Sequence, residues 1–179
     1  VIGSGPAGLM AADVLSRQKN ISVTLFEKRP ALGRKLFIAG ASGLNVTSSI
    51  PQKELEKIYE PQPWIWGSIF AQFSRDDWLA FIHQLGLETF QGTSARHFLR
   101  GMKGRPLIKA WQEKLLRQGV NFAIKKECIG FEICHFERPL IRLRFDDDEE
   151  REFSAVCFAL GGGSWEPLEN PLRWPQLFI

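Results

Sequence analysis

The feature that most constrains the fold is a run of six small residues near the beginning of the chain. Residues 3–8 read Gly-Ser-Gly-Pro-Ala-Gly, which has the pattern G-x-G-x-x-G. An apolar pair precedes this run, apolar residues at helical spacing follow over 6–18, and β-branched residues alternate over 21–26. This order predicts strand, turn, helix and strand over residues 1–28, and therefore an α/β fold of the Rossmann type.

The glycine pattern predicts a dinucleotide site because each glycine has its own physical role. Gly3 permits the tight turn, Gly5 lets the backbone approach a pyrophosphate, and Gly8 permits close packing of helix on strand. The helix N-terminus directs unpaired N–H groups and its positive dipole end at the phosphates. Glu27, 24 positions after Gly3, would bind both ribose hydroxyls and would repel a 2′-phosphate. The cofactor-binding residues predicted in this region are Gly3, Ser4, Gly5, Pro6, Ala7, Gly8, Glu27 and Lys28.

Three features favour FAD over NAD as the dinucleotide. Proline and alanine at 6–7 are a common flavoprotein variant of the pattern. A glycine and two cations at 33–35 can reach back to the pyrophosphate, and an apolar strand predicted over 153–160 ends in glycines that allow close backbone approach. The alternatives are a solvated basic loop, a core strand ending in a turn, and a glycine-rich turn that binds nothing. These features add five residues to the predicted cofactor-binding set, which are Gly33, Arg34, Lys35, Gly161 and Gly162.

The rest of the chain predicts further elements from local signals. Residues 29–50 predict a loop with a short apolar insert, and residues 51–70, with three prolines, predict no element. A capping-box variant and glycine stop signals predict two amphipathic helices, which run from Ser74 to Gly86 and from Pro106 to Gly119. Strands are predicted over 120–133, 140–145 and 153–160, with the acidic run 146–150 as a hairpin turn.

Composition narrows the class of protein. The chain has 44% hydrophobic and 24% charged residues, and its net charge of +3 predicts no nucleic-acid or membrane partner. No apolar run approaches the roughly 20 residues that a bilayer-spanning helix needs. Three cysteines without metal spacing predict reduced thiols in a cytoplasmic protein without a metal site. Because little of a strand precedes the first glycine, we expect a piece of a longer protein, truncated at both ends. The oligomeric state is left open.

Several motifs together resemble the HI0933-like family of FAD-dependent flavoproteins. Members of that family carry G-R-K followed by a glycine-rich N-V-T loop. The motifs that carry the resemblance are G-S-G-P-A-G at 3–8, F-E-K at 26–28, G-R-K-L at 33–36, A-G-A-S-G-L-N-V-T at 39–47, G-T-S at 92–94 and A-L-G-G-G-S-W at 159–165. This combination is most similar to a bacterial subgroup whose relatives are described as NAD(P)/FAD-dependent oxidoreductases or aminoacetone-oxidase-like enzymes. The resemblance covers the chain, but only the N-terminal part of such a protein.

The resemblance implies a Rossmann-like FAD-binding domain of the three-layer ββα, two-dinucleotide-binding type, interrupted by an inserted domain. It implies that residues 33–35 and a loop containing Gly43 and Asn45 run along the pyrophosphate toward the flavin ring. It also implies that adenine contacts the backbone at Cys128, for which the alternative is a small buried cysteine. The implied segments are 1–50 for the first FAD-binding part, 51–100 for a connecting helical region, 101–165 for the second FAD-binding part with a β-meander, and 166–179 for the start of the insert or remaining domain.

The chain departs from the family pattern at three places. Gly43-Leu44 stands where many relatives have Arg-Cys, residues 96–99 read R-H-F-L in place of R-V-F-P, and residues 169–172 lack glycines that relatives carry. Residues 28–60 contain no cysteine, which disfavours thiol–disulfide chemistry. The three histidines form no triad or metal pattern, and no catalytic residue is predicted.

The function expected from the sequence is therefore that of an FAD-binding oxidoreductase fragment. It would act on a small-molecule substrate and exchange electrons with NAD(P) or oxygen. Two alternatives stay open: an NAD-dependent dehydrogenase with the same glycine pattern, and a nucleotide-binding fragment without activity.

Overall fold

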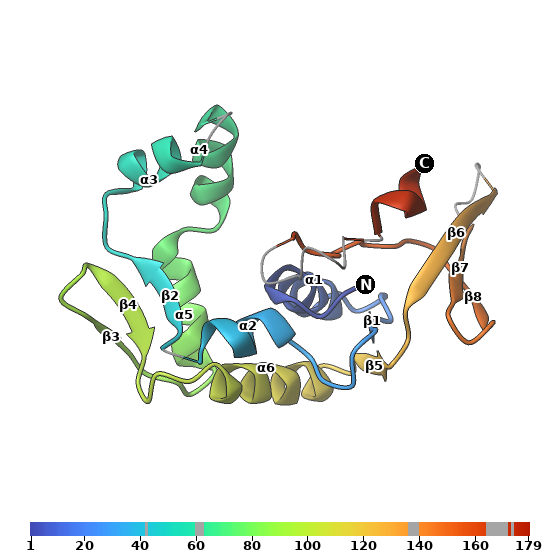
Figure 1. The fold of residues 1–179 in the computed structure, drawn as a ribbon, viewed down its shortest axis with the longest axis horizontal. Coiled ribbons are helices and arrows are strands. Elements are labelled where there is room, and N and C mark those ends of the chain that lie inside the picture. Colours follow the sequence, from blue (N-terminus) through green and yellow to red (C-terminus); the bar gives the residue numbers. More distant parts are fainter. Residues whose placement is uncertain (42, 60–62, 136–139, 164–171, 173) are drawn as a thin grey trace. The chain divides into compact units, whose positions relative to one another are not determined.

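The chain forms two compact units, which Figure 1 shows as a ribbon. The computed structural model describes residues 1–41, 43–59, 63–135, 140–163, 172 and 174–179. The first unit joins Val1–Lys35 to Gln112–Ile179, and the second unit is Leu36–Trp111. Half of the predicted segment 166–179 and the last two residues of the 159–165 motif lie outside the described residues.

The first unit contains a parallel β-arrangement with a helix beside it and an antiparallel meander. Strands β1 and β5 pair in parallel, and Ile2 forms parallel bridges to both Phe26 and Phe158, so that it lies between them. Ile2 and Phe26 are almost completely buried. The predicted order of strand, turn, helix and strand is confirmed. The elements of this unit are α1 (Pro6–Ser16), β1 (Thr24–Glu27), β5 (Asn121–Ile124), β6 (Cys128–His135), β7 (Leu140–Phe145), β8 (Glu150–Phe153) and the 3₁₀ helix η1 (Trp174–Phe178).

Helix α1 is held by an apolar face and by a buried carboxylate. Leu9 and Ala12 are completely buried. The sequence predicts the helix correctly but places its apolar face at Ala7, Ala11, Val14 and Leu15, which is wrong, because Ala7 is exposed and Val14 is 50% exposed. Asp13 is also completely buried, and its carboxylate pairs with Lys114 and Arg17. A buried charge without such partners would cost several kcal/mol. The ion pairs therefore fix α1 to the C-terminal part of α6, the helix that contains Lys114.

Strands β6, β7 and β8 form the predicted meander in that order. The acidic run forms the β7–β8 hairpin turn, and Asp148 in this turn has φ +63°. Lys126, which lies between β5 and β6, forms ion pairs with Asp147 and Glu149 of the turn. One face of the meander contributes Leu143 and other apolar side chains to the core around Ile2 and Phe26. The strand predicted over 140–145 and the hairpin turn predicted at 146–150 are confirmed, with the difference that Glu150 is already the first residue of β8.

The single strand predicted over 120–133 is wrong, because the chain forms β5 and β6 with a break between them. Lys125 in the break has φ +55°. The N–H groups of Lys125 and Lys126 donate to the carbonyl oxygens of Arg29 and Glu27, at 3.2 Å and 3.0 Å. These bonds end the parallel pairing with β1, after which the chain turns into the antiparallel meander.

The continuous strand predicted over 153–160 is also wrong. Phe153 ends β8, residues 154–157, all of them described, form no strand, and Phe158 pairs alone with Ile2. The N–H of Ile2 donates to Cys157 O at 2.9 Å, and the N–H of Ala159 donates to Ile2 O at 2.8 Å. The chain must pass here from the antiparallel meander to the parallel sheet, and an unbroken strand cannot belong to both.

The second unit contains an antiparallel sheet of order β2-β4-β3 and several helices. Trp111 is almost completely buried, with its ring 4.9 Å from that of Phe81 and 5.6 Å from that of Trp78. The boundaries between the two units fall within α2, after Lys35, and within α6, after Trp111. The elements are α2 (Arg34–Ala39), β2 (Asn45–Ser48), α3 (Gln52–Ile58), α4 (Pro63–Gln72), α5 (Arg75–Gln84), β3 (Thr89–Gln91), β4 (Arg96–Leu99) and α6 (Arg105–Arg117).

The predictions for residues 29–70 miss four elements, which are α2, β2, α3 and α4. Pro51 is the N-cap of α3 and Pro63 is the first residue of α4. Proline is well suited to the start of a helix, so these prolines mark helix beginnings rather than irregular structure. Ring contacts of Tyr59 with Trp66 and Phe70, at 4.7 Å and 5.9 Å, hold α3 beside α4.

The two helices predicted from capping signals are confirmed. Ser74 caps α5 with a complete capping box involving Asp77, and Gly86 follows the helix with φ +78°. Helix α6 is followed by Gly119, which has φ +81°.

We expect acid to destabilise α5 through its capping box. The pKa of Asp77 lies below its usual value because the Ser74 hydroxyl and backbone N–H donate to the carboxylate. A lowered folded-state pKa adds stability above the unfolded value of about 3.9, and this stability is lost as the pH falls through the folded pKa. Urea unfolding of the wild type and of Asp77→Asn between about pH 6 and pH 2 tests this. The difference in unfolding free energy should shrink toward low pH. A difference that is constant with pH would contradict the prediction.

Candidate functional site

The loop between Ile2 and α1 and the first turn of that helix contain two positions, Gly3 and Gly8, at which a side chain would clash with neighbouring backbone atoms. Gly3 has φ +99°, and a Cβ on it would lie 2.4 Å from the carbonyl oxygen of Ala159. A Cβ on Gly8 would lie 1.8 Å from the carbonyl oxygen of Gly3 and 3.3 Å from Cβ of Ala159. The loop, the first turn of α1 and the chain at Ala159 are therefore in direct contact, which glycine alone permits here.

Gly5 differs from these two glycines because the space beside it is open. Apart from its chain neighbours, no described residue places an atom within 4 Å of the position that a Cβ would take. Gly5 is the N-cap of α1, Pro6 and Ala7 are exposed, and within the described chain no side chain caps this helix. A helix N-terminus in this state presents N–H donors and the positive end of the dipole, which favours an anion.

Glu27, at the end of β1, points at this loop. Its Oε2 accepts hydrogen bonds from the backbone N–H of Ser4, at 3.1 Å, and from the Ser4 hydroxyl. Its Oε1 accepts from the backbone N–H of Arg29 at 2.8 Å. Ser4 is 1% exposed, whereas Glu27 is half-buried. The acidic residue and the glycine loop thus form one site.

Two further predicted segments join this site. The N–H of Gly33 donates to the carbonyl oxygen and the hydroxyl of Ser4, at 3.1 Å and 3.2 Å. The Lys35 ammonium donates to the carbonyl oxygen of Gly162, and Gly161 beside it has φ +77°. We call this arrangement the glycine-loop site, and it consists of residues Gly3–Gly8, Glu27, Gly33–Lys35 and Gly161–Gly162.

Lys28 and Cys128 have other partners. The Lys28 ammonium lies 3.3 Å from Oε1 of Glu127 on the surface. Cys128 is 8% exposed in the apolar core, its thiol donates to the carbonyl oxygen of Gly130 at 3.5 Å, and burial raises its pKa. The structure therefore places Cys128 among buried core residues, and its backbone contact with adenine stays a prediction.

Gly43 and Asn45 belong to the second unit. Gly43 has φ +128°, and a Cβ on it would lie 2.4 Å from Cε of Met102. Asn45 begins β2 opposite Phe98 of β4. Their contact with a cofactor stays a prediction.

Sequence reasoning missed two features of the glycine-loop site. Ala159 contacts both Gly3 and Gly8, and the available signal was a small residue just before the glycines of the last apolar segment. The Ser4 hydroxyl joins Glu27 to Gly33, and a serine between two glycines gives no local signal of such contacts.

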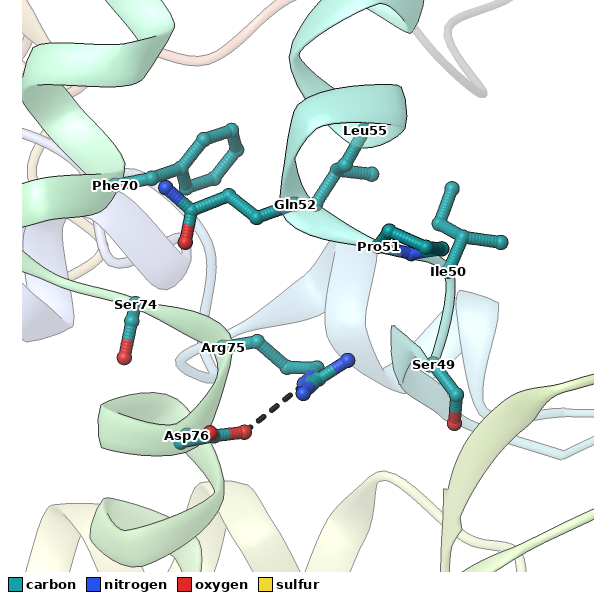
Figure 2. A pocket seen from close by; sticks show the side chains of 9 residues that line it. All are labelled: Ser49, Ile50, Pro51, Gln52, Leu55, Phe70, Ser74, Arg75 and Asp76. Atoms are coloured by element: carbon teal, nitrogen blue, oxygen red, sulfur yellow. Dashed lines mark hydrogen bonds and ion pairs between the residues drawn. The ribbon is translucent and has the colours of Figure 1, made fainter.

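The second unit has a cavity of about 220 Å³, shown in Figure 2. Charged and hydroxyl groups in and beside it are paired with each other: Arg75 Nε donates to Asp76 Oδ1 at 2.9 Å, and the Ser49 hydroxyl lies 2.7 Å from Nε2 of His97. None of the predicted cofactor-binding residues lines it. The lining residues are Ser49, Ile50, Pro51, Gln52, Leu55, Phe70, Ser74, Arg75 and Asp76.

Among the described residues, histidine, cysteine and acidic side chains form no group of three that could hold a metal ion. The helices within the same ranges are all too short or too polar to cross a bilayer.

The parallel strands, the glycine loop and α1 define a Rossmann-type domain. Residues 1–172 match the family described as the HI0933-like protein Rossmann domain, so the chain belongs to that family. The predicted family is thereby confirmed.

Solved structures are similar to this chain at low sequence identity. THI4 of Thermovibrio ammonificans is similar over 80% of this chain and 46% of its own, with a TM-score of 0.52 and 14% identity. The oxygenase for 2-methyl-3-hydroxypyridine-5-carboxylic acid is similar over 85% and 36%, with a TM-score of 0.47 and 18% identity. CabE, an aromatic hydroxylase from angucycline biosynthesis, is similar over 85% of this chain and 28% of its own. Its TM-score is 0.45 and its sequence identity is 17%. The chain spans less than half the length of each of these proteins.

Proposed function

We propose that the chain forms the FAD-binding part of a flavin-dependent oxidoreductase. The observation that carries the proposal is the position of Glu27 against a glycine loop whose outer side is open at Gly5. Because no described side chain caps this helix start, its N–H groups are available to an anion. The glycine-loop site therefore has the features of a diphosphate site with a ribose acceptor beside it.

The residues present fit an adenine dinucleotide. No described residue beyond the adjacent chain stands where a side chain on Gly5 or Gly162 would lie, so the backbone can approach phosphate oxygens at two places. The N–H groups at the start of α1 would hold the pyrophosphate, and Glu27 would hold the ribose. The carboxylate of Glu27 favours a ribose with free hydroxyls over one with a 2′-phosphate.

The course of the chain after Glu27 supports FAD rather than NAD. An NAD-dependent dehydrogenase would continue in repeated short βαβ units. Here the next strand that pairs with β1 is β5, which begins at Asn121, and the chain between them returns through Gly33 and Lys35 to the glycine-loop site. This return agrees with the G-R-K motif of the resembled flavoproteins.

In the proposed mechanism the chain binds and orients the cofactor. A bound flavin supplies reversible electron and hydride transfer. The start of α1 would offset the charge of the pyrophosphate, and Glu27 would fix the adenosine end. The segment Gly33–Lys35 would bring the two cations, Arg34 and Lys35, to the diphosphate. The substrate would be a small molecule, and the electron partner would be NAD(P) or oxygen.

The experiment is FAD uptake by the purified protein. After incubation with FAD and removal of free flavin, we expect bound flavin bands near about 370 and 450 nm. Bands that bleach with a reductant and return with oxygen would support an oxidoreductase over an inactive nucleotide-binding fragment. A protein that retains no flavin contradicts the proposal, and NADH binding without flavin would favour the dehydrogenase.

A further inference from the structure

We propose that Ser4 is a positioning residue that sets selectivity for the ribose hydroxyls through Glu27, an inference that rests on the proposed function. Ser4 lies between Gly3 and Gly5 and is 1% exposed. A side chain buried to this extent does not face a ligand in the open space beside Gly5. Its effect on a nucleotide must therefore pass through the groups that its hydroxyl contacts.

The Ser4 hydroxyl has a protein partner on each side. It donates to Oε2 of Glu27 and accepts the N–H of Gly33 at 3.2 Å. A serine hydroxyl has one proton to donate, and in Ser4 that proton is engaged by the carboxylate. Ser4 therefore joins the acidic residue at the end of β1 to the segment that carries Arg34 and Lys35.

The same contacts determine which oxygen of Glu27 has capacity for a ribose. A carboxylate has about four acceptor positions. Ser4 occupies two of them on Oε2, and the N–H of Arg29 occupies one on Oε1 at 2.8 Å. The remaining capacity lies on Oε1. Because three donors hold the carboxylate, it presents this oxygen in a fixed direction and loses little conformational freedom when a ribose hydroxyl binds.

The test compares two nucleotides in the full protein. ADP carries both ribose hydroxyls, and 2′,3′-dideoxy-ADP carries neither. We expect the wild type to bind ADP about tenfold more tightly, which corresponds to about 1.4 kcal/mol. In Ser4→Ala the affinity for ADP should fall about fivefold to tenfold, a typical effect of losing a hydrogen bond that orients a charged group. The affinity for the dideoxy nucleotide should stay within about twofold of the wild-type value, because the diphosphate contacts are intact.

Three further variants sharpen the comparison. Ser16→Ala is the matched control, because it removes a hydroxyl that donates to Asp13 O at 3.2 Å at the other end of α1, and both affinities should be unchanged. In a Glu27→Ala background, Ser4→Ala should have no further effect on ADP. Ser4→Cys keeps the buried volume with a weak donor, and it carries the same expectation if Ser4→Ala fails to fold.

The outcomes separate this inference from the proposed function. Equal weakening of both nucleotides, or additive effects of Ser4→Ala and Glu27→Ala, would show a general structural role for Ser4 and overturn the inference. A selective loss of ADP affinity supports it. If the wild type binds neither ADP nor FAD, the proposed function itself fails, and this inference fails with it.

Discussion

Replacing Gly5 by alanine is expected to weaken FAD binding about 100-fold, or by about 2.7 kcal/mol, while the protein stays folded. The backbone of Gly5 has φ −67°, which any residue adopts, and the added methyl group meets no described residue outside the adjacent chain. We therefore expect a change in unfolding free energy below about 1 kcal/mol, because the poorer N-cap offsets the lower entropy of the unfolded chain.

The loss of binding at Gly5 follows from the space that a diphosphate would need. Phosphate oxygens must come within hydrogen-bond distance of the backbone N–H groups at the start of α1. A methyl group on Gly5 would occupy the open side of this loop. Titration with FAD, followed by flavin fluorescence, measures the change. Wild-type affinity in Gly5→Ala would show that the diphosphate does not bind against this residue.

Replacing Gly8 by alanine is expected to lower the stability of the protein strongly, whereas Gly5→Ala leaves the protein folded. The added Cβ would lie 1.8 Å from the carbonyl oxygen of Gly3, a backbone atom that cannot move without separating α1 from the strand residue Ile2. We expect the unfolding free energy of the first unit to fall by about 3 kcal/mol or more, at the upper end of the range for overpacking. Urea unfolding followed by circular dichroism measures this loss.

Gly5→Ala is the matched control for Gly8→Ala, because each adds one methyl group to the same loop. Equal losses of stability in both variants would contradict the observation that the space beside Gly5 is open and the space beside Gly8 is filled. A Gly8→Ala protein as stable as the wild type would likewise contradict the tight contact between α1 and Gly3.

The parts of the fold that could be predicted from the sequence are those set by local patterns. The glycine loop, α1 and β1 follow from glycine spacing and from apolar periodicity, and α5 follows from the capping box at Ser74. Local patterns failed where the chain changes between sheets, at Lys125 and after Phe153, because the same apolar residues suit either sheet. They also failed at Pro51 and Pro63, where proline begins a helix in a segment for which the prolines predicted no element.

The candidate site was predictable in its residues but only partly in its contacts. The placement of Glu27 beside the loop follows from strand order in a Rossmann-type fold. The contact of Lys35 with Gly162 joins positions 127 residues apart, and no local pattern specifies it. The contacts of Ala159 with Gly3 and Gly8 likewise depend on how the returning chain pairs with Ile2.

A crystal structure of the protein with FAD would show directly whether the glycine-loop site binds the cofactor. We expect the diphosphate against Gly5 and the N-terminus of α1, with the adenosine ribose bound to Glu27. FAD bound elsewhere, for example at the cavity beside Ser49 and Arg75, or a ribose turned away from Glu27, would contradict it.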